Sequence, residues 1–97
     1  MGNDKFEQIA KAVVIKWYER EGKTLSEGDV YVVWACKTLQ NNKALVSTTV
    51  SNGMYFELTY NGDKDELYVD AYKKWENVCV KSPEKNFGIR KEKNYAH

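Results

Sequence analysis

From Val30 onward the chain alternates apolar and polar residues, which is the spacing of a β-strand with one buried face. Four runs follow this pattern: Val30 to Thr38, Ala44 to Val50, Met54 to Tyr60 and Glu66 to Tyr72. The stretches that separate them, Gln40-Asn41-Asn42, Ser51-Asn52-Gly53 and Asn61-Gly62-Asp63-Lys64, are short and rich in turn formers. Because such short connections join antiparallel neighbours, the spacing predicts a four-stranded antiparallel meander.

Residues 4–21 have a different period and predict a helix. Apolar side chains recur three and four positions apart, at Phe6, Ile9, Ala10, Val13, Val14 and Trp17. They form one stripe that can cover a sheet, with Ile15 on the opposite side. Asn3 or Asp4 is expected to cap the helix start, and Gly22 to end the helix. The predicted fold class is therefore α+β, with the N-terminal helix packed on the meander.

Strand register is predicted by requiring the apolar faces of neighbouring strands to agree. A three-residue loop ending in a left-handed Gly53 pairs Val46 with Leu58. In the next hairpin we prefer Leu58 opposite Leu67, because a tight Asn61-Gly62 turn would set Glu57 against Glu66. The same requirement, applied to the first hairpin, places Lys37 on the outward face. The predicted inner face comprises Val30, Val32, Trp34, Cys36, Ala44, Val46, Val50, Met54, Phe56, Leu58, Leu67, Val69 and Ala71.

The C-terminal third leaves one alternative open. Residues 65–79 also fit a helical stripe, so they could form a second helix on a three-stranded sheet, although their Tyr and Val residues favour a strand. Residues 1–80 are predicted to form a single α+β domain. Residues 81–97 contain the only proline and carry five basic against two acidic side chains. They are predicted to be a flexible basic tail.

Several function classes are disfavoured by residues that the chain lacks. The only histidine is His97, and Cys36 and Cys79 belong to no CxxC pair, so we expect no catalytic residue, no metal and no cofactor. No run of about 18 apolar residues is present, and the N-terminus does not look like a signal peptide. We therefore expect no membrane span and a cytoplasmic location.

The predicted outer face of the sheet is the candidate binding site. Its candidate residues are Tyr31, Tyr55, Glu57, Tyr68, Asp70 and Tyr72. A solvated face, a face for a protein partner or a second copy, and a platform for nucleic-acid bases all fit this composition. Three acidic residues there outnumber Lys37, which disfavours nucleic acid unless the basic tail contributes. On the predicted register, Glu57 and Asp70 are diagonal neighbours and are interpreted as solvated carboxylates.

Two stretches, VYVVWACKTLQNNKALVSTT and GMYFELTYNGDKDELYVDAYKKWEN, resemble a family of small uncharacterised proteins from phages and prophages of Gram-positive bacteria. The resemblance covers about residues 5–80. It implies a phage or prophage origin and a role in the host cytoplasm, and it assigns no activity. The sequence therefore predicts a non-enzymatic protein-binding module, with nucleic-acid binding through the basic tail and sheet tyrosines as the alternative.

Overall fold

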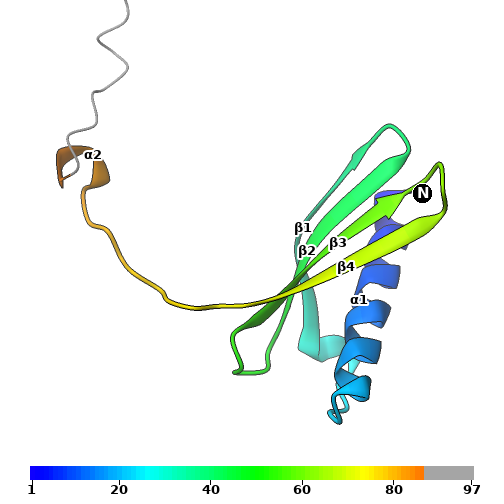
Figure 1. The fold of residues 1–97 in the computed structure, drawn as a ribbon, viewed down its shortest axis with the longest axis horizontal. Coiled ribbons are helices and arrows are strands. Elements are labelled where there is room, and N and C mark those ends of the chain that lie inside the picture. Colours follow the sequence, from blue (N-terminus) through cyan, green and yellow to red (C-terminus); the bar gives the residue numbers. More distant parts are fainter. Residues whose placement is uncertain (87–97) are drawn as a thin grey trace, which may run out of the picture.

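One helix lies across one face of a four-stranded sheet (Figure 1). The structure is a computed structural model that describes residues 1–86. Its elements are α1 (Asn3–Arg20), the short 3-10 helix η1 (Glu27–Asp29), β1 (Val30–Thr38), β2 (Asn41–Thr48), β3 (Met54–Asn61), β4 (Glu66–Lys73) and α2 (Pro83–Asn86). The strands are antiparallel in the order β1-β2-β3-β4. The predicted helix-on-meander fold is confirmed, and the alternative second helix over 65–79 is wrong.

Helix α1 ends as predicted but does not start as predicted. The Gly2 backbone precedes the helix, and no side chain caps it, so the expected cap by Asn3 or Asp4 is wrong. At the other end Gly22 has φ +88°, and the Lys23 amide donates to the Tyr18 carbonyl at 2.8 Å. This is a Schellman ending, in which a left-handed glycine lets free helix carbonyls find donors.

The core lies between α1 and the inner face of the sheet. Four helix residues spaced by four positions are buried: Phe6, Ala10, Val14 and Tyr18. Tyr18 was not in the predicted stripe, while Val13 and Trp17 are only half-buried, and Ile15 also packs against the core. The rings of Trp17 and Phe56 meet edge to face, with their centroids 5.0 Å apart. The buried stripe is therefore rotated slightly from the predicted one.

Two strand registers differ from the prediction by two residues. Val46 lies opposite Phe56 rather than Leu58, and Leu58 lies opposite Val69 rather than Leu67. A slip of two residues leaves every side chain on its face, because side chains alternate with a period of two. The observed register places Glu57 directly opposite Asp70, whereas the predicted register opposes no two carboxylates.

The connections differ accordingly from the predicted ones. Asn41 and Asn42 belong to β2, so the first turn is Leu39-Gln40, with φ +55° at Leu39. The second loop spans residues 49–53, and Gly53 has the expected positive φ of +74°. The third loop spans residues 62–65 and is not a tight Asn61-Gly62 turn. There the Asn61 Oδ1 accepts from the Asp63 amide at 3.0 Å, which stabilises the longer loop.

A β-bulge at Val33 reverses the faces of the second half of β1. The register shifts between Val32 and Trp34, so Trp34 pairs with Leu45 on the outer face. The predictions that Trp34 and Cys36 face inward and that Lys37 faces outward are therefore wrong. The small Ala35 side chain faces the core instead. A tryptophan at this place would hold α1 away from the sheet.

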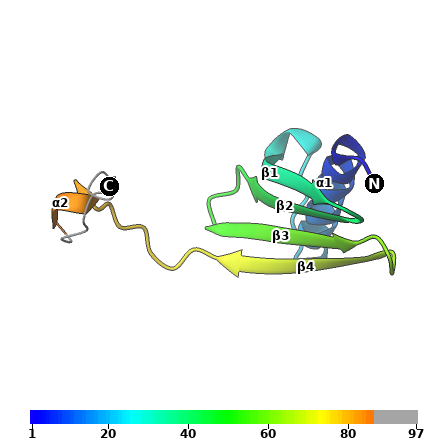
Figure 2. The same cartoon turned by 90° about the horizontal axis from the view of Figure 1, so that it is seen from above.

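Helix α1 covers only part of the inner face. It packs chiefly on β1 and β2, whereas β4 is exposed along most of its length (Figure 2). Val13, Lys16, Trp17, Arg20 and Val69 line an open groove of about 480 Å³ between α1 and β4. The inner positions predicted for β4 thus have the right orientation but little cover.

The chain leaves the sheet after Lys73 as an extended segment (Figure 1). The Lys74 amide still donates to the Gly53 carbonyl at 2.7 Å, and Trp75 beyond it is 95% exposed. Of the predicted tail, Pro83–Asn86 forms the short helix α2. The rest of that tail, residues 87–97, lies outside the described residues.

Candidate functional site

The outer face of the sheet is organised as cross-strand rows of side chains. Residues directly opposite each other in neighbouring strands share a face, so the pairing defines each row. From β1 to β4 the rows are Tyr31-Ser47-Tyr55-Tyr72, Trp34-Leu45-Glu57-Asp70, Cys36-Lys43-Thr59-Tyr68 and Thr38-Asn41-Asn61-Glu66. All six candidate residues lie on this face, so the sequence correctly predicted that they share one surface.

The row at the end of the sheet near the β2–β3 loop is the most aromatic. Tyr55 and Tyr72 stack with centroids 5.1 Å apart and planes 16° from parallel. Tyr31 lies in the same row on β1 and is 49% exposed. A hollow of about 270 Å³ beside Tyr31 and Tyr55 is bordered by the β2–β3 loop. This row presents ring faces and hydroxyl groups at the surface.

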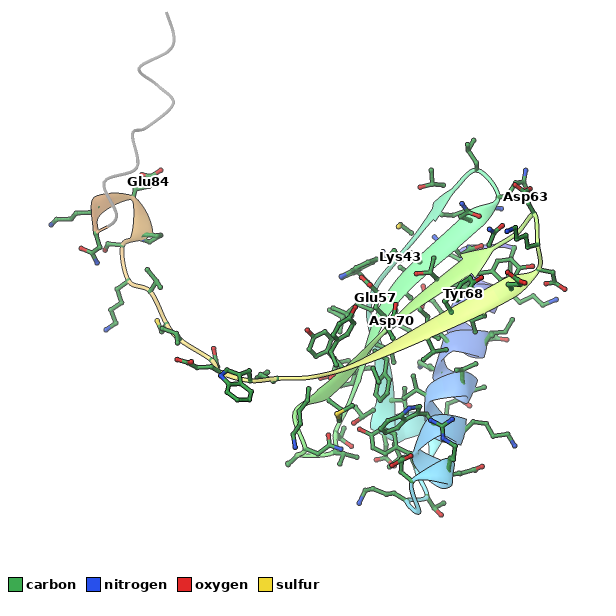
Figure 3. All side chains as sticks on the ribbon, viewed as in Figure 1. Lys43, Glu57, Asp63, Tyr68, Asp70 and Glu84 are labelled. Atoms are coloured by element: carbon green, nitrogen blue, oxygen red, sulfur yellow. The ribbon has the colours of Figure 1, made fainter. Side chains whose placement is uncertain are left out.

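The next row carries two opposed carboxylates and one compensating lysine. Glu57 lies opposite Asp70, and the Lys43 Nζ is 3.5 Å from the Glu57 Oε2 (Figure 3). Among residues 1–86, no basic group forms an ion pair with Asp70. The Asp70 charge raises the pKa of the Tyr72 phenol, with smaller contributions from desolvation and Glu57. The centre of the face is therefore locally acidic.

Tyr68 lies beside a further carboxylate, that of Glu66, toward the start of β4. Its hydroxyl donates to the Glu66 Oε1 at 2.9 Å, and this hydrogen bond is the main reason why the pKa of Tyr68 is raised. The Tyr68 side chain is 55% exposed. The phenol is therefore oriented by a neighbour on its own strand.

Sequence reasoning missed Trp34, Cys36 and Lys43 as members of this face. Trp34 is 43% exposed, and Cys36 is an exposed free thiol. The signal was present in Val32-Val33-Trp34, where three successive large apolar residues interrupt the alternation. Such an interruption is typical of a bulge, which changes the faces of all later residues in the strand.

The side chains on this face offer aromatic rings, hydroxyl groups and carboxylates. In the part of the chain that the structure describes, no three His, Cys, Asp or Glu side chains gather where they could hold a metal ion. In that same part, no helix is both long and apolar enough to cross a membrane. The face instead combines aromatic area, hydroxyl groups and unbalanced negative charge, which suits contact with a basic and partly apolar surface.

Comparison with known proteins identifies the family. Neither the curated proteins nor the solved structures include a match to this chain. A family of unknown function, DUF6275, matches residues 7–82, which span most of α1, the whole sheet and the extended segment that follows β4. The chain belongs to this family of unknown function, DUF6275.

Proposed function

We propose that this protein is a non-enzymatic protein-binding module whose outer sheet face receives a partner presenting basic and apolar side chains. The observation that carries this proposal is the adjacency of the stacked Tyr55 and Tyr72 rings to the carboxylate of Asp70, for which no ion pair is found among the described residues. Aromatic rings with a carboxylate beside them bind Lys and Arg side chains through cation–π contact and ion pairing.

Exposure of the aromatic residues supports the same proposal. Tyr31, Trp34, Tyr68 and Tyr72 are each more than 40% exposed although they belong to one face. Tyrosine and tryptophan are enriched at protein interfaces because they bring large area and a polar tip at low entropy cost. The bulge in β1 adds Trp34 to this surface, which makes it more apolar than the sequence predicted.

Nucleic-acid binding is less well supported by the same face. On this face the acidic residues Glu57, Glu66 and Asp70 outnumber the basic Lys43. A phosphate backbone requires a basic surface. The basic tail that we considered as compensation lies mostly outside the described residues. We further propose a phage or prophage origin and a cytoplasmic role, on the resemblance of residues 5–80 to phage and prophage proteins.

Charge reversal at one position on the face tests the proposed function. Wild type, Asp70→Lys and the control Glu19→Lys are immobilised, and proteins retained from a lysate of a Gram-positive bacterium are identified by mass spectrometry. Glu19 is exposed on α1, so its reversal changes the net charge equally but leaves the outer face intact. A partner should be retained by wild type and by Glu19→Lys and lost by Asp70→Lys.

The interaction is then measured with the purified partner by calorimetry. Asp70→Lys should weaken binding at least about tenfold, which corresponds to about 1.4 kcal/mol. Equal affinity of wild type and Asp70→Lys would contradict the proposal. A salt-sensitive shift of single-stranded DNA in a gel, abolished by removing residues 81–97, would instead support the nucleic-acid alternative.

A further inference from the structure

The outer edge of β4 is an open pairing surface. β4 is the terminal strand of the sheet, and all eight of its residues pair with β3 in one uninterrupted register. It contains no proline and no bulge, which are two of the features that protect edge strands. The opposite edge, β1, is interrupted by its bulge at Val33. The two edges therefore differ, and β4 is the one left able to accept another strand.

The hydrogen-bonding groups that β4 presents at this edge can be identified. The Lys74 amide donates to the Gly53 carbonyl, which continues the β3–β4 ladder. Because such bonds alternate along an antiparallel strand, the even-numbered residues of β4 bond to β3. The backbone groups of Leu67, Val69, Ala71 and Lys73 therefore point outward. They form a regular row of donors and acceptors that pair with no other strand among residues 1–86.

We propose that β4 pairs antiparallel with β4 of a second copy, with Val69 opposite Val69 of that copy on the two-fold axis. This register places Tyr68 opposite Asp70 and Glu66 opposite Tyr72 of the other copy. Shifting it by two residues in one direction opposes Asp70 to Asp70. Shifting it by two in the other direction opposes Asp70 to Glu66. Like charges directly opposite each other disfavour both alternatives.

The inner face of β4 supports the same partner. Val69 is 36% exposed beside the open groove to Trp17, and Leu67 and Ala71 flank it on the same face. In the proposed register Leu67 lies opposite Ala71 of the second copy, so the apolar strip continues across the axis. Lys73 also falls opposite Asp65, the residue that precedes the strand, which adds a pair of opposite charges at each end.

Pairing at β4 does not depend on the function proposed for the outer face, but it would enlarge that face. Pairing at β4 produces one sheet of eight strands, in which the outer faces of both copies lie side by side. A single strand pair belongs to the class of interfaces below about 1,200 Å² that associate weakly and reversibly. Association is therefore expected at high protein concentration, and the dimer would bind a repeated partner twice.

Analytical ultracentrifugation from about 10 µM to about 1 mM tests the pairing. The wild-type mass should rise toward twice the 11.3 kDa of one chain. Ala71→Pro removes an amide that points to the free edge, so the monomer should fold, as checked by circular dichroism, but stay monomeric. Ala71→Thr keeps this amide and should dimerise. Wild type that remains monomeric, or Ala71→Pro that dimerises as wild type does, would overturn the proposal.

Cysteine cross-linking tests the register in chains whose Cys36 and Cys79 are replaced by serine. Val69→Cys should form a symmetric disulfide under mild oxidation, because only a residue on the axis faces its own copy. Ala71→Cys is the control, since its two copies would lie about 14 Å apart along the strands, beyond the reach of a disulfide. Equal cross-linking of the two variants would refute the register. Tyr31→Glu should leave dimerisation unchanged, and loss of the dimer in this variant would place self-association on the outer face instead.

Discussion

Replacing Gly62 by alanine is expected to destabilise the fold by pushing apart two hairpin loops. A Cβ at Gly62 would fall against the backbone carbonyl oxygen of Gln40, in the turn between β1 and β2. Rotation of a side chain cannot relieve contact with a backbone atom, so one of the loops must move. That movement also weakens the hydrogen bond from the Gly62 amide to the Asn41 Oδ1, which is 3.3 Å long.

The size of the effect follows from three contributions. Overpacking typically costs about 1–3 kcal/mol. Weakening an exposed hydrogen bond adds about 0.5 kcal/mol. Alanine also lowers the conformational entropy of the unfolded chain, which stabilises the fold by about 0.4–1 kcal/mol. The net loss in the free energy of unfolding is therefore about 2 kcal/mol, which lowers the melting temperature of a domain this size by roughly 8–16 °C.

Thermal and urea denaturation followed by circular dichroism measure this loss. Gly28→Ala is the control for a permissive site, because the nearest atom, the Ser26 Oγ, lies 3.9 Å from the new Cβ. Gly22→Ala has open space but φ +88°, so it should cost about 1–2 kcal/mol through backbone strain alone. A Gly62→Ala variant as stable as Gly28→Ala would refute the close contact between the two loops.

Three further predictions concern the acidic residues and the bulge. Ser26 and Thr49 donate hydrogen bonds that keep the pKa of Asp29 below its usual range, with the Ser26 donors contributing most. A lowered pKa adds stability above the unfolded pKa, so Asp29→Asn should unfold more easily than wild type near pH 7, and in urea titrations this difference should shrink progressively as the pH falls below about 4. Asp70→Asn should lower the pKa of Tyr72, measured by NMR of labelled tyrosines, and an unchanged pKa would contradict the opposed carboxylate as its cause. In a variant with both Trp17→Phe and Trp75→Phe, acrylamide should readily quench the fluorescence of the remaining Trp34. Fluorescence that is protected from acrylamide would mean that β1 has no bulge.

Much of the fold was predictable because it depends on local patterns. The period of 3.6 residues in the first 21 positions and the period of two after Val30 correctly predicted one helix and four strands. The candidate site was predictable for the same reason. Tyr55, Glu57, Tyr68, Asp70 and Tyr72 lie in strands whose alternation is unbroken, so they share a face in any register that keeps the apolar residues inside.

The tertiary structure decided what alternation does not encode. Registers that differ by two residues have the same faces, so loop geometry and side-chain packing placed Glu57 opposite Asp70. The bulge at Val33 depended on which side chain fits beneath α1, and the small Ala35 faces the core while Trp34 faces out. Tyr18 became buried because its ring packs on Trp17 and Phe56, a contact between a helix and a strand far apart in sequence. The sequence thus determined the elements and their faces, and packing between those elements determined their alignment and which edge stayed open.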